Sequence, residues 1–511
     1  MAEISYPPAS DLVTDVIDSA DLAGFGYRQE LHRTIGSYAS FATGFSFVSI
    51  LTTVFQLFAF GFAFGGGTFF WTWPLVFGGQ FMVALMFSEL ASRWPISGAI
   101  YQWASRLGGQ LWGWTAGWLM LVAQIVTVSA AAIALQAVLP ALWSGFQILH
   151  GNPSPFSPTG AANAVVLGLV LLALTTGINV SGIKVTSAIN VIGVTCELIG
   201  VAVLVVLLFG HAERGPSVVL HGSGLGISGF IISGLMAAYV LVGFDSAAEL
   251  SEETHNPRRV APRTILRAVA ASGIGGGLML LAALMAAPSL TDGRLGIEGI
   301  AYVVLTQLGG FLGRLVLLNV AIAVTVCTLA IQAATIRMIF SMARDKVLPF
   351  SATLAKVSPR TGTPVAPAVL VGLLSGSVLV INVGQAGLFT TLASVCIMLL
   401  YLAYLMVTGP LLLARLRGEL CEVENEGDFH LGRWGLPVNS VAVVFGAAMT
   451  INLGWPRAEV FDPAGGHWYL QWFAPLFLAA TLTVGAVAYV VQRTQARPAD
   501  LPDLEALRVA A

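Results

Sequence analysis

Twelve stretches of mostly apolar residues, each about 20 residues or longer, follow one another along the chain. Each is long enough to cross the hydrocarbon core of a bilayer as a helix. Only 10% of the 511 residues are charged, whereas soluble globular proteins carry about 25% Asp, Glu, Lys and Arg. So few charges cannot cover a water-facing surface of this size. The sequence therefore predicts an all-α integral membrane protein and excludes a large soluble domain. The expected spans are 41–64, 68–91, 112–140, 162–182, 187–210, 226–248, 265–288, 312–341, 365–383, 388–414, 436–454 and 469–491.

The basic residues indicate how these spans are oriented. When the N-terminus is placed in the cytoplasm, 20 of the 24 Lys and Arg residues lie in the cytoplasmic tails and loops. Cytoplasmic loops of membrane proteins carry an excess of Lys and Arg. We therefore expect a multi-pass protein of the cytoplasmic membrane, with both termini cytoplasmic and loose polar tails at 1–40 and 492–511.

Net charge and cysteine usage exclude several other classes. A net charge of −2 gives no basic field for nucleic acid. The four cysteines form no CxxC pair, so neither a metal site nor a cofactor is expected.

Two carboxylates lie well inside predicted spans, Glu197 in the fifth and Asp245 in the sixth. An ionisable group at the bilayer centre costs about 2.5–3.5 kcal/mol on insertion scales, so such groups mark functional sites. We interpret Asp245 as a proton-carrying group, with a helix-end residue as the alternative. For Glu197, a proton carrier and a structural acid remain equally open.

Other polar and aromatic side chains have simpler interpretations. Gln124 and Thr328 lie deep enough to reach a central cavity, Thr328 as an ion ligand, although hydrogen bonding between helices is the default role. Four glutamates at span ends are expected to be interfacial charges: Glu89, Glu249, Glu252 and Glu253. An interfacial aromatic belt explains Trp71, Trp73, Trp94, Trp103, Trp112, Trp114 and Trp118.

The first and sixth spans both contain features of a broken helix. Gly243 interrupts the sixth near Tyr239–Asp245, and the middle of the first contains Ser49, Thr52, Thr53 and Gln56. Interruptions at corresponding positions, five helices apart, indicate an inverted repeat with a binding site at the membrane midplane. The alternative for the first span is that its hydroxyls bond the preceding helical turn.

Three segments resemble one family of membrane proteins. ELASRWPISGAIYQWASRLGG (Glu89–Gly109), GFDSAAELSEETHNPRRVAPRTI (Gly243–Ile265) and SMARDKVLP (Ser341–Pro349) are similar to segments of amino acid–polyamine–organocation permeases. The form of the second segment is most similar to the amino acid/choline branch, which includes GABA permeases. The resemblance implies a LeuT-type fold, with spans 1–5 (41–210) and 6–10 (226–414) in inverted repeat and two further helices at 436–491.

The resemblance also implies where a substrate binds. The broken first helix corresponds to Ser49–Thr53, including Ile50. The sixth-helix break contributes backbone carbonyls of Tyr239, Val240 and Val242, an aromatic gate at Tyr239, and the adjoining Gly243 and Phe244. Asp245 corresponds to an acid that is often tied to coupling. Some relatives carry a lysine on helix five; the nearest residue here is Glu197.

One departure from the family pattern affects the expected substrate. The first-helix break of the family contains glycines whose amides hold a substrate carboxylate, but Ser49–Thr53 contains none. A carboxylate-free amine or quaternary ammonium would instead favour aromatic faces, for which Phe47, Tyr239 and Phe244 are candidates.

The sequence thus predicts a secondary active transporter that moves an amino acid or related small amine by alternating access, driven by a proton or by sodium. A carrier or exchanger for choline, a polyamine or a GABA-like amine is the first alternative, and a membrane ligand sensor without transport is the second. No HExxH, GxSxG or P-loop motif indicates an enzyme or an ATP-driven pump.

Overall fold

The computed structural model describes residues 9–155, 157–383, 386–419, 428–462 and 465–495. Their regular structure is helical, with one isolated bridge between Ile35 and Thr254. Among these residues, nine helical stretches are long and apolar enough to cross a membrane, and two shorter apolar helices accompany them. The chain is therefore a multi-pass, all-helical membrane protein. Most of the expected C-terminal tail, 496–511, lies outside the described residues.

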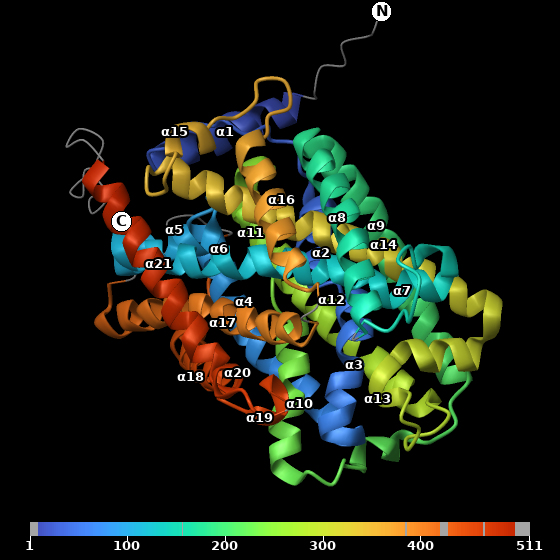
Figure 1. Cartoon of the computed structure of the whole chain (residues 1–511). Helices are drawn as coiled ribbons and strands as arrows, with labels where there is room; N and C mark the ends of the chain where they lie inside the picture. Colours follow the sequence, from blue (N-terminus) through green and yellow to red (C-terminus); the bar gives the residue numbers. More distant parts are fainter. Residues whose placement is uncertain (1–8, 156, 384–385, 420–427, 463–464, 496–511) are drawn as a thin grey trace, which may run out of the picture.

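Each expected span overlaps one or two helices of the structure (Figure 1). These helices are α2 (Ser37–Val48), α3 (Ile50–Gly65), α4 (Thr72–Arg93), α6 (Gln110–Ile133), α7 (Leu135–Leu142), α8 (Pro158–Val180), α9 (Ile183–Gly210), α10 (Gly226–Val240), α11 (Ser246–Glu249), α12 (Pro257–Ala286), α14 (Ile300–Arg344), α16 (Val365–Val380), α17 (Ala386–Arg417), α18 (Gly435–Gly454) and α21 (Phe473–Gln495). Helix α20 (Trp468–Gln471) overlaps the start of the last expected span, and the remaining α-helices are α1 (Ala9–Gly24), α5 (Ala99–Gly108), α13 (Leu295–Glu298), α15 (Ser351–Leu354) and α19 (Ala458–Phe461). Short 3-10 turns occupy Gly66–Trp71, Ser144–Phe146, Pro216–Leu220, Ser251–Glu253 and Gly432–Trp434.

Local sequence explains several helix boundaries. At the start of α8, the Ser157 hydroxyl accepts the Gly160 N–H at 2.9 Å, and Pro158 occupies the first helical position. The start of α14 differs from the expectation, because the helix begins at Ile300 and not near 312. Gly309, with φ 71°, bends this helix, and the polar and glycine residues around it lower the local hydropathy.

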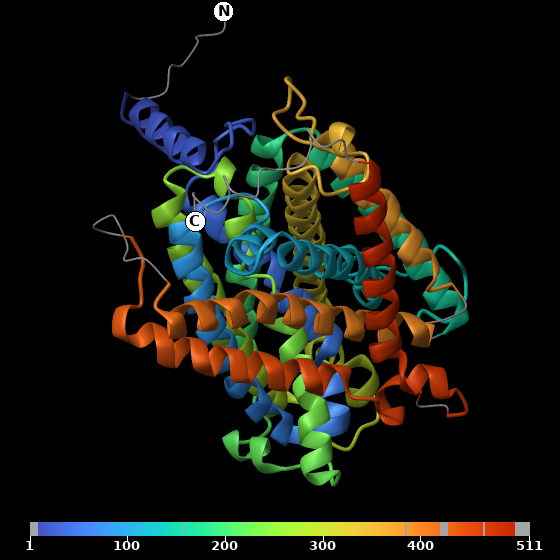
Figure 2. The ribbon, with the colours of Figure 1, turned by 90° about the vertical axis from the view of Figure 1, so that its left-hand side faces the viewer.

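Two broken helices occupy the centre of the molecule. Figure 1 shows α2 and α3 running from the end near α1 toward the opposite end, and α10 followed by α11 running back. As a result, α3 packs against α10 while α2 packs against α11. Helices α4, α9, α12 and α14 surround this centre, and α17 lies beside α18 on one flank (Figure 2).

The aromatic-belt interpretation is wrong for several tryptophans. Trp73, Trp103 and Trp114 have exposed fractions of 2%, 0% and 3%. Each donates its indole N–H to a backbone carbonyl oxygen within the protein. These side chains lie at helix–helix contacts, because tertiary packing covers the span ends where they occur. Trp71 and Trp112, by contrast, are exposed.

Candidate functional site

The first break is confined to a single residue. Helix α2 ends at Val48, and Ser49 adopts a left-handed conformation with φ 35° before α3 begins at Ile50. The Ser49 N–H still donates to Phe45 O at 2.8 Å, and Ser49 O accepts the Thr53 N–H at 3.0 Å. The break is therefore shorter than the expected 49–53, because residues with a Cβ resist positive φ and Ser49 alone adopts it. Thr52 and Thr53 belong to the first turn of α3.

Glu197 reaches this break from α9. Its Oε1 accepts the Ser49 hydroxyl at 2.9 Å and the Leu51 N–H at 3.1 Å. The first amide groups of a helix have no partner within the helix and carry partial positive charge. Glu197 therefore caps the N-terminus of α3 from a neighbouring helix. The side chain is fully buried, and its second oxygen, Oε2, has no hydrogen-bond partner among the described residues.

The second break is longer and depends on a glycine. Helix α10 ends at Val240 and α11 begins at Ser246, so Tyr239 remains helical while Val242–Asp245 lie in the break. Gly243 has φ 92°, and a Cβ built there would lie 1.8 Å from Cδ1 of Phe47. Only glycine satisfies both the backbone conformation and this close approach between the two breaks.

A tyrosine from α17 bridges the second break. The Gly243 N–H donates to the Tyr404 hydroxyl oxygen at 3.0 Å, and that hydroxyl donates to Asp245 Oδ1. Asp245 is fully buried, and its Oδ2 has no partner among the described residues. Tyr404 is not among the residues predicted from the sequence. The available signal was a tyrosine inside an apolar span, because its hydroxyl needs a partner when it is buried.

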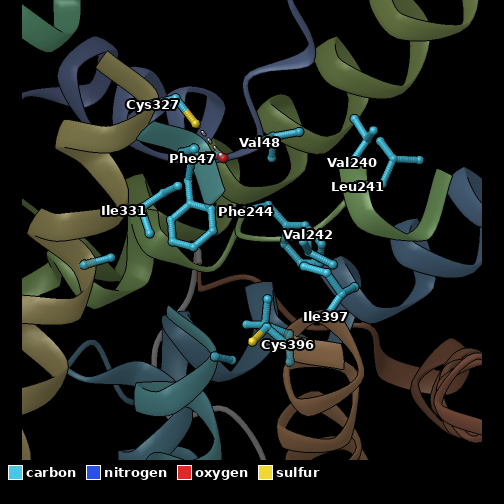
Figure 3. Packing of buried hydrophobic residues seen from close by; sticks show 14 of the residues in the cluster. Phe47, Val48, Val240, Leu241, Val242, Phe244, Cys327, Ile331, Cys396 and Ile397 are labelled. Carbon is cyan, nitrogen blue, oxygen red and sulfur yellow. Dashed lines mark hydrogen bonds between the residues drawn. The ribbon is translucent and has the colours of Figure 1, made fainter. Parts of the chain in front are cut away.

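A small cavity lies between the two breaks. Figure 3 shows apolar side chains of α2, α10, α14 and α17 gathered there. The space open to the centre of a water molecule is about 20 Å³, which accommodates about one water. The site therefore contains very little free volume in this conformation. Its wall consists of Phe47, Val48, Thr52, Thr53, Gln56, Thr127, Ala131, Tyr239, Val240, Val242, Cys327, Ile331 and Ile397.

The structure places the sequence-selected residues in two groups. Six of them line the cavity: Phe47, Thr52, Thr53, Tyr239, Val240 and Val242. The others lie outside the wall: Ser49, Ile50, Gln124, Gly243, Phe244, Asp245, Glu197 and Thr328. Phe244 instead packs against the rings of Phe87 and Tyr404.

Sequence reasoning missed two cavity residues by small helical offsets. Cys327 lines the cavity, whereas the neighbouring Thr328, about 100° further around α14, donates its hydroxyl to Val324 O at 2.8 Å. Thr127 lines the cavity one turn after Gln124, whose amide donates to Glu249 Oε1 at 3.0 Å. The depth of a residue along its helix was predictable from the sequence, but the face of the helix that lines the cavity was not.

The interpretation of the glutamates as interfacial charges is wrong. Glu249, Glu252 and Glu253 have exposed fractions of 0%, 1% and 0%. Arg337 of α14 forms a two-point ion pair with Glu253, with both N–O distances 2.8 Å. Arg344 pairs with Glu252 at 2.8 and 2.7 Å. Glu89 is likewise 6% exposed and lies 2.6 Å from a guanidinium nitrogen of Arg415. Partners distant in sequence make this burial tolerable.

The N-terminal segment packs onto the same region, contrary to the expectation of a loose tail. The N–H groups of Thr34 and Ile35 donate to Glu253 O at 2.9 and 2.8 Å. The Tyr27 hydroxyl donates to Asp345 Oδ1 at 2.9 Å, and its ring centroid lies 3.9 Å from the Arg344 guanidinium carbon. Burial raises the pKa of Asp345 above its ordinary value, although Arg344 and the tyrosine hydroxyls oppose this shift.

Comparison with known proteins agrees with this architecture. The chain matches the family described as amino acid permease over residues 33–484. It is 28% identical to amino-acid permease BAT1 of Arabidopsis thaliana over 472 residues, which cover 87% of this chain and 90% of the relative. It is 25% identical to amino-acid permease 2 of Neurospora crassa over 483 residues, covering 89% and 85%. The methylthioribose transporter of Bacillus subtilis is 24% identical over 331 residues, covering 62% and 70%.

The match to the family spans most of the chain and includes both broken helices and every segment that lines the cavity. Permeases of this kind are transporters and not enzymes. The chain belongs to the amino acid permease family.

Proposed function

We propose that this protein is a secondary active transporter that carries a small amine or amino acid across the cytoplasmic membrane by alternating access. The observation that supports this most is the cavity enclosed between two helices that are interrupted side by side. Interrupted helices release backbone groups from the regular helical pattern, and a bilayer tolerates such groups only where protein or a water-filled cavity receives them. The relatives' names include amino-acid permeases and a methylthioribose transporter, so the family handles more than one kind of small solute.

The proposed arrangement is a LeuT-type inverted repeat. In it, residues 41–210 and 226–414 form the two repeats of five spans, and 436–491 adds two more, giving twelve spans with both termini cytoplasmic. The antiparallel course of α2–α3 and α10–α11 supports this arrangement (Figure 1), and so does the bias of Lys and Arg to one side. Rocking of the broken helices against their neighbours would open the cavity to each side in turn.

We assign the coupling role to the buried carboxylates Asp245 and Glu197, with a proton as the driving ion. Neither forms an ion pair with a basic side chain among the described residues, and each keeps one oxygen without a hydrogen bond. A buried carboxylate in this situation is favoured as the neutral acid. Binding and release of a proton in different access states would couple transport to the proton gradient. Asp245 adjoins the second break directly and is therefore the first candidate.

Replacement of Asp245 by asparagine is expected to abolish proton-driven accumulation. Coupling to one proton supports at most about tenfold accumulation per pH unit of gradient, and Asp245→Asn should reduce the inside-to-outside ratio to about one. Asparagine keeps an acceptor for the Tyr404 hydroxyl but carries no titratable proton. Uptake into proteoliposomes with an imposed pH gradient measures this ratio. Asp292→Asn, in an exposed loop between α12 and α14, is the control; unchanged accumulation by Asp245→Asn would contradict the assignment.

Counterflow distinguishes a carrier from a sensor or a channel. Purified protein is reconstituted into liposomes that are loaded with one unlabelled compound, chosen in turn from amino acids, GABA, polyamines and choline, and the same labelled compound is added outside. A carrier accumulates label transiently without any ion gradient, because the unlabelled compound moving out down its concentration gradient drives the labelled compound in. Folded, reconstituted protein that exchanges none of the compounds would overturn the proposed function.

A further inference from the structure

A further buried carboxylate lies next to the second helix break. Glu249 is the last residue of α11, and its side chain has an exposed fraction of 0%. The Glu249 N–H donates to Asp245 O at 3.2 Å, so the two acids are one helical turn apart. Side chains at this spacing lie on the same face of a helix, with about 5–6 Å between their Cβ atoms. Glu249 therefore adjoins the residue to which we assign proton coupling.

Within the described part of the chain, Glu249 has no basic side chain as a direct partner. Arg337 of α14 binds Glu253 at two points, and Arg344 binds Glu252 in the same way. The arginines of α5 and α12, which also pack against α11, bind other groups or are exposed: Arg106, Arg258, Arg259, Arg263 and Arg267. The tyrosines of the surrounding helices have other partners: Tyr38 with Thr195, Tyr101 with Asp345, and Tyr404 with Asp245. A buried carboxylate without a counter-ion is favoured as the neutral acid.

The side-chain amide of Gln124 independently indicates that Glu249 carries a proton. Gln124, on α6, is also fully buried, and its Nε2 donates to Glu249 Oε1 at 3.0 Å. The other oxygen of each group, Gln124 Oε1 and Glu249 Oε2, has no hydrogen-bond partner among the described residues. Both oxygens are acceptors when Glu249 is ionised, and a buried acceptor without a partner is costly. A proton on Glu249 Oε2 would supply the donor that both oxygens lack, in a two-point pair of acid and amide.

The course of the chain places Glu249 between Asp245 and one end of the molecule. Helix α11 runs from the break toward the end near α1 (Figure 1). Next along the chain, Glu252 and Glu253 pair with arginines, and Glu253 O accepts two N–H groups of the N-terminal segment. Under the proposed topology this end is cytoplasmic. A proton that leaves Asp245 for the cytoplasm therefore passes Glu249.

We infer that Glu249 is a neutral acid paired with Gln124, and that it relays the coupling proton from Asp245 toward the cytoplasm. The inference rests on the proposed proton coupling and adds a residue to it. When the cytoplasmic side opens, Glu249 releases its proton to water and becomes a carboxylate. The O–H bond of Asp245 then breaks as an O–H bond forms on Glu249, which leaves Asp245 ionised and Glu249 neutral again.

Infrared spectroscopy of the purified full-length chain tests the protonation state of Glu249. A neutral carboxylic acid has a C=O stretching band that an ionised carboxylate lacks. We expect this band in the difference spectrum between the unaltered chain and Glu249→Gln at neutral pH. Glu89→Gln is the matched control, because Glu89 is a buried carboxylate paired with Arg415, and its difference spectrum should lack the band. Absence of the band from the Glu249→Gln difference spectrum would overturn the inference.

A second variant, Gln124→Ala, tests the pairing of acid and amide without altering Glu249. This substitution removes the amide and keeps the acid. The C=O band of Glu249 should therefore shift in frequency, because its oxygens lose their hydrogen-bond partner. The measurement does not depend on whether Glu249→Gln folds. An acid band in the same position in the unaltered chain and in Gln124→Ala would show that Glu249 is not a neutral acid bound to Gln124.

Transport in proteoliposomes tests the relay and separates it from the proposed function. Proton-driven uptake requires release of a proton in every cycle, whereas counterflow exchanges substrate with the proton still bound. With a compound that counterflow identifies, Glu249→Gln should lower the initial rate of proton-driven uptake relative to that of counterflow by at least about tenfold, as the loss of a proton-transfer group implies. Glu89→Gln should leave this ratio unchanged. An equal fall of both rates in Glu249→Gln would overturn the relay, whereas failure of counterflow in the unaltered chain would overturn the carrier function.

Discussion

Gly243→Ala is expected to abolish transport while the protein still folds as a helical bundle. The added Cβ would lie 1.8 Å from Phe47 Cδ1, and alanine would have to adopt φ 92°. Strained backbone of this kind costs about 1–3 kcal/mol, and overpacking in a close-packed region costs a similar amount. The change therefore forces the two breaks apart at the point where they enclose the cavity. We expect the initial rate of counterflow to fall by at least about tenfold.

Gly234→Ala is a matched control on α10, the helix that precedes the break containing Gly243. A Cβ at Gly234 would meet Thr72 at 3.8 Å, an ordinary van der Waals contact, and its backbone does not need positive φ. Alanine in a helix interior is more favourable than glycine by about 0.5–1 kcal/mol. Transport by Gly234→Ala should therefore remain near that of the unaltered chain. Counterflow at the normal rate by Gly243→Ala would show that the close approach of the breaks is dispensable.

Arg337→Met is expected to destabilise the protein more than any surface substitution. Arg337 and Glu253 are both fully buried, and the two nitrogen–oxygen distances between them are 2.8 Å. Removal of one partner leaves an uncompensated buried carboxylate, which costs about 3–5 kcal/mol. We expect a large fall in thermal stability and in the yield of monodisperse protein on gel filtration.

Two further variants isolate the charge from the packing. Addition of Glu253→Gln to Arg337→Met removes the uncompensated charge and should recover much of the lost stability. Arg417→Met removes one partner of an exposed pair, Arg417–Glu419, whose charged atoms lie 3.9 Å apart. Exposed pairs contribute about 0–1 kcal/mol, so this variant should behave like the unaltered chain. A similar loss of stability in Arg337→Met and Arg417→Met would contradict the importance of burial.

The two helix breaks show how much of the candidate site could be predicted from the sequence. A glycine inside an apolar span identified the second break to within two residues, because glycine alone adopts φ 92° without strain. The first break was located through its hydroxyl residues, but its length was overestimated. Its single non-helical residue, Ser49, is held by Glu197 from another helix, and no local signal in Ser49–Thr53 reports that contact.

The burial of three glutamates, by contrast, could not be predicted from the sequence. Glu249, Glu252 and Glu253 occur at the end of an apolar stretch, where a linear analysis expects contact with water or lipid headgroups. Their burial depends on Arg337, Arg344 and Gln124, which lie more than 80 residues away in sequence. The N-terminal segment covers them further, through hydrogen bonds to the backbone of Glu253.

The amino-acid sequence alone determined that the chain is helical and embedded in a membrane, and it located the interruptions in two of its helices. These properties follow from apolar length and from glycine, which act over a few residues. The tertiary structure decided which face of each helix lines the cavity, which carboxylate caps which half-helix, and which charges are buried. Those outcomes depend on contacts between segments far apart in the chain, since a neighbour's donor or acceptor determines whether a polar group can be removed from water.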